Sequence, residues 1–215
     1  MTTEELKSIT FKIGRLFDII KDCNDPLIIE ENIEELTNNL KETLIHQQKL
    51  NRYNLYNNGF HCEEKKDYAS MKKWYLQAIE MGDGNAMERL GAYYFNIEND
   101  WVLMKKYYLM AIEKGNVQAM YDLGVHYQKI EKDYGLMKKY YLMAIEKGDV
   151  CSMNRLGDYY QETEKNYELM KKYYLQAMEK GDINAQRNLI SFYEDIMKKH
   201  NKMKESLVSI IRYNN

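Results

Sequence analysis

A run of 18 residues occurs twice in this chain, 33 residues apart, and this internal repeat limits the possible folds more than any other feature. The two copies begin at Leu103 and Leu136 and differ at three positions. Methionine marks the same position in every copy, at Met71, Met104, Met137, Met170 and Met203. A fixed period of this length is typical of arrays in which each repeat is one supersecondary unit that packs against its neighbours.

Apolar residues within each repeat have the spacing of two helices. In the third copy the first set follows the i, i+3, i+4, i+7 pattern of one helix face, at Met120, Leu123, Gly124 and Tyr127. The second set repeats the pattern at Tyr134, Met137, Tyr141 and Ala144. The chain contains a single proline, Pro26, so the repeats lack the residue that breaks helices. The sequence therefore predicts tandem helical hairpins.

Glycine and short polar side chains mark the ends of the predicted helices. A glycine, which tolerates the left-handed backbone, closes each second helix at Gly82, Gly115, Gly148 and Gly181. The next residue can cap the following first helix, at Asp83, Asn116, Asp149 and Asp182. A second set of caps precedes the second helices, at Asp67, Asp100, Asp133 and Asn166.

Small residues at fixed positions should let neighbouring helices approach closely. They are Ala78, Ala111, Ala144 and Ala177 in the second helices, and Gly91, Gly124 and Gly157 in the first. Tyrosines recur beside them, at Tyr94, Tyr127, Tyr160, Tyr193, Tyr75, Tyr108, Tyr141 and Tyr174. An aromatic ladder could stack nucleic-acid bases, but the helical spacing favours packing in the core with each hydroxyl bonded to a partner or water.

These residues resemble the sel-one-like repeat, a relative of the tetratricopeptide repeat. The first half of the family pattern is matched by Ala86, Leu90, Gly91 and Tyr94, and the second by Asp67, Tyr68, Trp74, Tyr75, Ala78 and Gly82. The resemblance covers residues 50–215, and the chain is also similar to compact arrays of large DNA viruses of amoebae. It implies an all-α fold, a right-handed alpha-alpha superhelix (solenoid) of about five hairpins, and a role as a protein adaptor or scaffold. An ankyrin array has a similar period, but its T-P-L-H signature is absent.

The chain departs from the family pattern in its linkers and at its ends. The linker within each hairpin is short and lacks a glycine-rich turn, and methionine replaces alanine at Met71 and its equivalents. The first unit should begin near Tyr53, with Asn57 and Asn58 where leucine and glycine are expected. In the last unit Ile190 replaces the glycine, and Ser206 and Leu207 replace the paired aromatics. Terminal repeats are expected to be atypical.

Residues 1–49 lie outside the repeat and form a predicted N-terminal helical cap, followed by five repeats over residues 50–215. One helix is marked by Leu6, Ile9, Ile13, Leu16 and Ile20, after a capping box of Thr2 and Glu5. Asp25 and Pro26 open a second, with an apolar stripe of Ile29, Ile33, Leu36, Leu40 and Leu44. The pair either docks on the array or joins the chain to a partner or a second copy.

Composition and scattered reactive residues argue against several classes of function. The formal net charge is −2, the N-terminus lacks a secretory pattern, and no apolar run is long enough for a membrane span. Three dispersed cysteines fit a reducing compartment, so a cytoplasmic protein is expected, in a host cell if the source is viral. The four histidines have no second ligand at metal-like spacing, and no catalytic motif appears. We therefore expect no enzyme, no metal and no cofactor.

Lysine pairs recur in the second helices, at Lys72–Lys73, Lys105–Lys106, Lys138–Lys139 and Lys171–Lys172. A row of lysines could meet the phosphates of a nucleic acid. However, glutamate recurs on the same helices at Glu80, Glu113, Glu146 and Glu179, and mixed signs are typical of a solvated outer face.

Positions that differ between copies point to a binding surface on the first helices, which line the concave side of related solenoids. One such position holds Tyr56, Arg89, Asp122, Arg155 and Asn188, and a second holds Leu55, Glu88, Tyr121, Asn154 and Arg187. A third holds Gly59, Ala92, Val125, Asp158 and Ser191. The predicted partner-binding residues are Tyr56, Glu88, Arg89, Tyr121, Asp122, Arg155, Asp158 and Arg187. Another protein or peptide would lie there, with the arginines facing acidic groups and Tyr121 as an aromatic anchor; unconstrained drift of exposed residues is the alternative.

A structural role is the second functional hypothesis. In it, residues 1–49 or the exposed last repeat would join two copies of the chain into a homo-oligomer. The sequence thus predicts a protein that binds another protein, with self-association as the alternative and nucleic-acid binding through the lysine row as a third reading.

Overall fold

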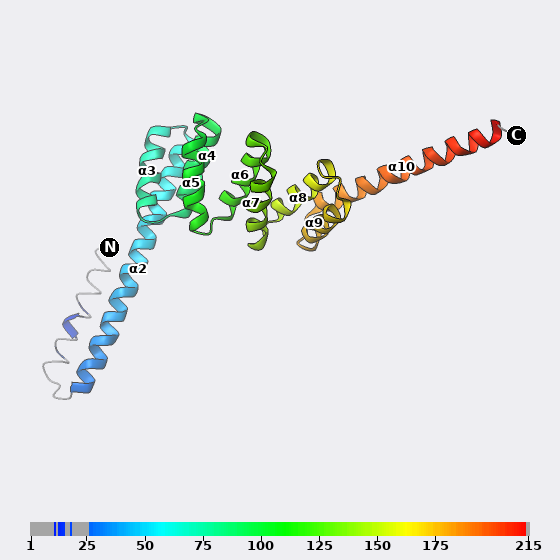
Figure 1. Cartoon of the computed structure of the whole chain (residues 1–215). Helices are drawn as coiled ribbons and strands as arrows, with labels where there is room; N and C mark the ends of the chain where they lie inside the picture. Colours follow the sequence, from blue (N-terminus) through cyan, green and yellow to red (C-terminus); the bar gives the residue numbers. More distant parts are fainter. Residues whose placement is uncertain (1–10, 12, 16–17, 19–25, 214–215) are drawn as a thin grey trace. The chain divides into compact units, whose positions relative to one another are not determined.

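The computed structural model describes residues 11, 13–15, 18 and 26–213, and all regular structure in this part of the chain is helical (Figure 1). The helices are α2 (Pro26–Glu64), α3 (Tyr68–Glu80), α4 (Gly84–Tyr93), η1 (Tyr94–Glu98), α5 (Trp101–Glu113), α6 (Val117–His126), η2 (Tyr127–Glu131), α7 (Tyr134–Glu146), α8 (Val150–Glu162), α9 (Tyr167–Glu179) and α10 (Ile183–Tyr213). The all-α hairpin fold that the repeat predicts is confirmed. Most of the helix predicted over residues 6–20 lies outside the described residues.

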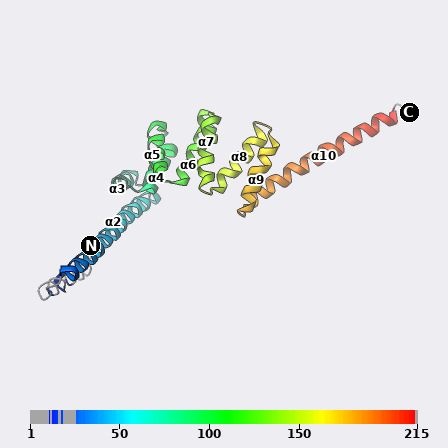
Figure 2. The same ribbon diagram turned by 60° about the horizontal axis from the view of Figure 1, so that its bottom comes forward.

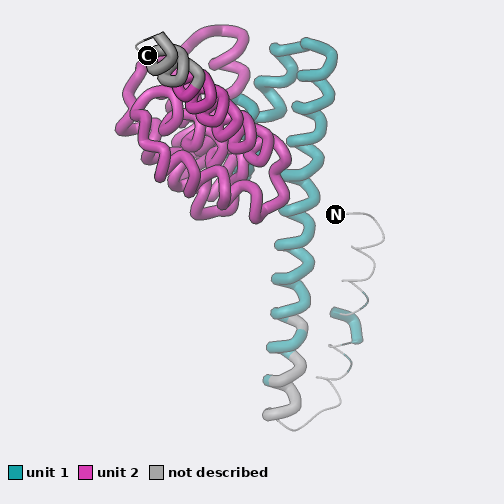
Figure 3. Tube along the Cα trace, turned by 90° about the vertical axis from the view of Figure 1, so that its right-hand side faces the viewer, with its two compact units in different colours: residues 1–90 teal, residues 91–215 magenta. Residues whose placement is uncertain are grey.

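The chain forms two compact units, residues 1–90 (unit 1) and 91–215 (unit 2), which Figure 3 shows in different colours. In unit 1, α3 packs antiparallel to the C-terminal part of α2. In unit 2 each helix from α5 to α10 packs against the next, so that α6 with α7 and α8 with α9 stand side by side as hairpins (Figures 1 and 2). The boundary between the N-terminal cap and the repeats, placed between residues 49 and 50, stays a prediction.

The predicted helix boundaries are confirmed at atomic level. The four closing glycines have positive φ angles between 76° and 90°, as a left-handed helix end requires. The side chains of Asp67, Asp100, Asp133 and Asn166 accept backbone N–H groups at the start of α3, α5, α7 and α9. Those of Asp83, Asn116, Asp149 and Asp182 do the same for the first helices. Each such cap contributes about 1 kcal/mol to stability.

The short linker inside the second and third hairpins is a π-helical turn. There η1 and η2 each add one residue to the helix before a left-handed residue ends it, and that residue is Asn99 or Lys132. In the first hairpin α2 ends at Glu64 without a π turn, and Lys66 is the equivalent left-handed residue. The first hairpin is therefore one residue shorter between its core glycine and its turn.

Lysine is poorly suited to the left-handed position at Lys132, where φ is 55°. The left-handed backbone costs an ordinary residue about 1–2 kcal/mol, and glycine avoids most of this cost. We therefore expect Lys132→Gly to raise the free energy of unfolding by up to about 1 kcal/mol in urea denaturation. Lys129→Gly, in the right-handed backbone of η2, is the matched control and should lower it by a similar amount. Destabilisation by both changes would contradict the assignment of the turn.

Close contact between glycine and tyrosine joins the two helices of each hairpin. The rings of Tyr108, Tyr141 and Tyr174 are buried, and a Cβ added at Gly91, Gly124 or Gly157 would lie 2.5–2.6 Å from ring atoms. The predicted role of these glycines in close packing is confirmed. Met71 and its equivalents Met104, Met137 and Met170 are also buried, as are the paired alanines.

In the first hairpin the glycine of this contact is Gly59, one residue later than the 33-residue frame predicts. A Cβ at Gly59 would lie 2.5 Å from the ring of Tyr75. The sequence analysis placed Asn58 at this position and assigned Gly59 to the variable surface, and both assignments are wrong. The missing π-turn residue explains the shift, because it moves every residue of α2 by one position relative to the frame.

The first unit does not begin with a helix near Tyr53. Helix α2 runs unbroken from Pro26 to Glu64, and its sequence offers no glycine or proline where a break was expected. Met81 stands where the other units have lysine, and it lies beside the additional N-terminal turns of α2. The apolar residue at this position thus matches the longer helix that faces it.

The last unit also differs from a hairpin. Helix α10 continues through the expected turn as a single helix of 31 residues. Two lysines, Lys198 and Lys199, occupy the positions of the left-handed residue and the N-cap, and Ile190, which is 51% exposed, replaces the core glycine. Because no second helix returns, Tyr193 is 45% exposed, whereas its equivalents Tyr127 and Tyr160 are buried.

Candidate functional site

Two of the predicted surface residues form a polar pair in unit 2. The Nε of Arg155 on α8 donates a hydrogen bond to the Tyr121 hydroxyl on α6, 3.2 Å away. The Tyr121 ring packs against that of Tyr141, with ring centres 5.9 Å apart and a tilt of 37°. Tyr141 in turn donates to the Gln128 Oε1 at 2.8 Å. A buried tyrosine therefore supports Tyr121, and Tyr121 orients the arginine.

Other predicted residues lie around this pair with bonds of their own. The Asp158 Oδ1 accepts from the Tyr174 hydroxyl at 2.7 Å and from the Asn188 amide at 3.3 Å, which ties α8 to α9 and α10. Asp122 accepts from the Gln118 amide at 3.0 Å. Arg187 is exposed, and its Nη1 lies 3.5 Å from Asn184 on the same helix. The structure thus joins Tyr121 to Arg155, and brings Asp158 to Asn188, which was not among the predicted site residues.

Unit 1 contains a second arrangement of the same kind. Arg89 on α4 lies close to Tyr56, whose ring lies 5.9 Å from that of Tyr75 with a tilt of 36°. The guanidinium of Arg89 also has two carboxylate neighbours, Glu63 at 3.9 Å and Glu88 at 3.8 Å. These five residues therefore form one group.

Comparison of the two groups corrects the position assigned to Tyr56. The 33-residue frame grouped Tyr56 with Arg89 and Arg155, but the contacts place it as the equivalent of Tyr121. The cause is the one-residue shift of α2. In the other hairpins a fixed number of residues separates the core glycine from its tyrosine. A search of the sequence for this spacing, allowing an offset of one residue, would have found Gly59 and with it the correct alignment.

The electrostatic environment keeps the arginine of unit 2 charged and Tyr141 neutral. The hydrogen bond that Arg155 donates to Tyr121 raises the pKa of Arg155 above its ordinary value, although partial burial opposes this. Burial raises the pKa of Tyr141 well above that of a free phenol. At neutral pH the surface therefore presents a guanidinium cation next to phenol groups.

The lysine pairs of the second helices are largely engaged within the protein. Lys105 forms an ion pair with Glu131, and Lys138 Nζ lies 2.8 Å from Glu164 Oε1. The hydrogen bond from Lys105 lowers the pKa of Glu131. In three of the four pairs the second lysine lies over the neighbouring tyrosine ring at 5.3–5.4 Å, at Lys106, Lys139 and Lys172. These contacts support the interpretation of the lysines as a structural outer face.

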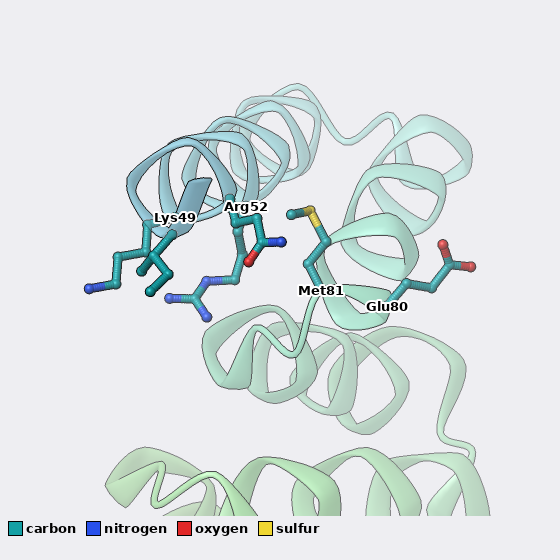
Figure 4. Close-up of a pocket in the computed structure, with 6 residues that line it drawn as sticks. Lys49, Arg52, Glu80 and Met81 are labelled. Atoms are coloured by element: carbon teal, nitrogen blue, oxygen red, sulfur yellow. The ribbon is translucent and has the colours of Figure 1, made fainter. Parts of the chain in front are cut away.

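A depression of about 420 Å³ in unit 1 lies between α2 and the end of α3 (Figure 4). Its lining consists of Ile45, Gln48, Lys49, Arg52, Glu80 and Met81. Met81 points toward the α2 side chains, while the Glu80 carboxylate points away from them. Arg52 is already paired with Asp83 at 3.6 Å. None of the predicted binding residues lines this depression.

Potential metal ligands are scattered over the described residues. Within that part of the chain no three His, Cys, Asp or Glu side chains come together as potential ligands. No helix described here is both long and apolar enough to cross a membrane. The expected absence of a catalytic centre and of a cofactor remains a prediction.

Comparison with known proteins identifies the fold. No protein-family model matches the chain, and no curated protein matches it significantly. A Sel1 repeat protein from Oxalobacter formigenes has a similar structure, with a TM-score of 0.59 and 21% identity over 90% of this chain and 81% of that one. The protective antigen c5321 of uropathogenic Escherichia coli, described as displaying an SLR fold, gives a TM-score of 0.59 and 21% identity over 90% of this chain.

The present chain spans 81% of the length of the Oxalobacter protein and 44% of the length of the E. coli antigen. Both similar structures are bacterial, so the resemblance to viral arrays stays a prediction. The hairpins, their glycine–tyrosine contacts and these two structural matches lead to one conclusion: the chain has the fold of the sel-one-like (Sel1) repeat proteins.

Proposed function

We propose that this protein is a scaffold or adaptor that binds a partner protein or peptide on the first helices of its hairpins. The observation that carries the proposal is the contrast between constant and individual positions. The tyrosines that meet the core glycines of unit 2 are identical in each hairpin and fully buried. By contrast, the positions of Tyr121, Arg155 and Arg187 hold different residues in different hairpins, and these three side chains retain exposed surface.

The geometry of unit 2 supports this reading. Arg155 and Tyr121 come from consecutive first helices, so a partner that contacts both would bridge two hairpins. Stable interfaces bury roughly 800 Å² on each partner, and a surface that crosses several hairpins can supply this area. The fold that this chain shares with the similar Sel1 structures is consistent with a binding role.

Affinity capture from cells with a triple variant tests the proposal. Alanine at Arg89, Tyr121 and Arg155 should abolish capture of the partner that the unchanged protein retains, because it removes the aromatic and both guanidinium groups. The control carries alanine at Lys139 and Leu142 on α7, which are exposed on a second helix. Equal capture by a triple variant that melts like the unchanged protein would contradict this assignment.

Self-association is the second candidate, and the exposed face of α10 favours it. Ile190, Ile196, Met197 and Met203 are each at least 45% exposed on this helix. A large apolar surface of this kind is typical of an interaction site. Mass measurement in solution over a range of concentrations, with Ile196→Glu as the comparison, tests this role. A monomer at every concentration would exclude it. The role of residues 1–49 lies largely outside the described residues.

A further inference from the structure

The two tyrosine–arginine groups are similar in arrangement and differ in charge. In both, a tyrosine of one first helix lies beside an arginine of the next and packs on a buried tyrosine at 5.9 Å, and in unit 2 the arginine donates a hydrogen bond to it. They are 66 residues apart at the arginines, which are Arg89 and Arg155. Each of the two groups can therefore serve as the internal control for the other.

Two carboxylates of the first group are replaced by amides in the second. The Tyr75 hydroxyl donates to Glu63 at 2.6 Å, whereas the equivalent Tyr141 hydroxyl donates to the Gln128 amide oxygen. The position of Glu88, which lies beside Arg89, is held by Asn154 beside Arg155. Both changes keep an acceptor oxygen in the side chain and remove a negative charge.

The consequence is an open set of hydrogen-bond donors at Arg155. Its Nε bonds Tyr121, and within the described residues its guanidinium has no ion pair. None of its nitrogens is buried without a partner, so Nη1 and Nη2, which carry four N–H groups, both retain some exposed surface. The Tyr121 hydroxyl accepts from Arg155 and keeps its own proton to donate. Nearby acceptors are occupied, since Asp158 receives two donors and Asp122 receives one.

We propose that Arg155 and Tyr121 bind a carboxylate of an acidic peptide segment in the partner, and that Arg89 does not. This inference rests on the proposed function and assigns the partner its chemistry. A carboxylate presents two oxygens that match the parallel N–H groups of a guanidinium. Arg89 cannot offer the same face at equal strength, because Glu63 and Glu88 already balance its charge.

A single charge fits this site better than the double charge of a phosphate group. In the described part of the chain Arg155 is the one cation bonded to Tyr121, and the carboxylates of Asp122 and Asp158 lie near the same Tyr141 ring. A phosphate would carry about −1.5 to −2 at neutral pH, so the second charge would be repelled by these aspartates. The site should therefore select Asp or Glu side chains, or a chain terminus, over phosphoserine.

The experiment uses the full chain and peptides selected on it from a random displayed library. The selected peptides should contain Asp or Glu, and changing that residue to its amide should weaken binding about tenfold, as expected for a charge-assisted hydrogen bond. Arg155→Gln should weaken binding of the acidic peptide to a similar extent. The matched control Arg89→Gln should change it less than about twofold, and the loss at Arg155 should diminish in high salt.

Asn154→Glu provides a test that adds a group instead of removing one. It places a carboxylate where Glu88 stands beside Arg89, so this carboxylate should pair with Arg155, and a variant that still unfolds cooperatively on heating should bind the acidic peptide about tenfold more weakly. Tighter binding when phosphoserine replaces the acidic residue would overturn the assignment of a carboxylate.

The outcomes separate this inference from the proposed function. One outcome would overturn the inference and leave the proposed function standing. In it, the peptides bind more weakly to the Tyr121→Ala variant but bind Arg155→Gln as well as they bind the unchanged protein. Peptides whose binding survives the triple alanine change would contradict both the inference and the proposed surface.

Discussion

Replacement of Gly124 by alanine is expected to destabilise unit 2 by about 3 kcal/mol. On an isolated helix the same change would stabilise by about 1 kcal/mol, because alanine is the better helix former. Here the added Cβ would lie 2.5 Å from the Cδ1 and Cε1 atoms of Tyr141. That ring cannot withdraw, since it is fully buried and its hydroxyl is bonded to Gln128.

Gly135→Ala is the matched control for this prediction. Gly135 lies in the first turn of α7, where the nearest atom to an added Cβ is the Asp133 Oδ1 at 3.3 Å. We expect this variant to be as stable as the unchanged protein or more stable by up to about 1 kcal/mol. Chemical denaturation of both variants measures the difference. Equal stability of the two would show that the tyrosine does not occupy the space beside Gly124.

The second large effect concerns a pair of aromatic residues whose sizes compensate. Trp101 on α5 faces the fully buried His126 on α6, with ring centres 5.6 Å apart and a tilt of 42°. The equivalent contacts are Tyr134 with Tyr159 at 5.2 Å and Tyr167 with Phe192 at 4.9 Å, tilted by 43° in both. The largest side chain of the series therefore meets the smallest ring.

Each single change within this pair should destabilise the protein, and the double change should restore it. His126→Tyr would overpack the core, and Trp101→Tyr would leave a cavity, at about 1–3 kcal/mol each. Together they recreate the contact of Tyr134 with Tyr159. The new hydroxyl at residue 126 could then donate to Glu131, as Tyr159 donates to Glu164 at 2.8 Å.

A double-mutant cycle in urea tests this compensation. We expect the double variant to be within about 1 kcal/mol of the unchanged protein, which corresponds to a coupling energy of about 2 kcal/mol. Simple addition of the two losses would contradict the pairing. Replacement of His126 also removes its contact with Glu131, which is 2.9 Å long. His126→Phe therefore serves as a further comparison, because it lacks the hydroxyl that tyrosine would bring.

The features that depend on local chemistry could be predicted from the sequence. Glycine at Gly82 and its equivalents, and the caps such as Asp100, act within a few residues of their own position, so their patterns are sufficient. The tyrosines that meet the core glycines were also predicted, because the period places both partners in every copy.

The features that depend on one additional or missing residue could not be predicted in the same way. A π turn leaves no strong signature in composition, and its absence from the first hairpin shifted Gly59 and Tyr56 by one position. The continuity of α10 depends on whether Ile190 and Leu207 can replace a glycine–tyrosine contact, which is a question of shape. The balance of charge at Arg155 also required knowledge of which side chains meet, since Gln128 lies far from it in the sequence.

Site-specific photo-crosslinking in cells tests the central claim most directly, namely that recognition takes place on the first helices. A photoreactive amino acid would be placed at Asp122 or Arg187 on the proposed surface, and at Val102 or Leu142, which are exposed on second helices. We predict a covalent adduct with a partner from Asp122 and Arg187 and none from the other two positions. Adducts from Val102 or Leu142 alone would contradict the account.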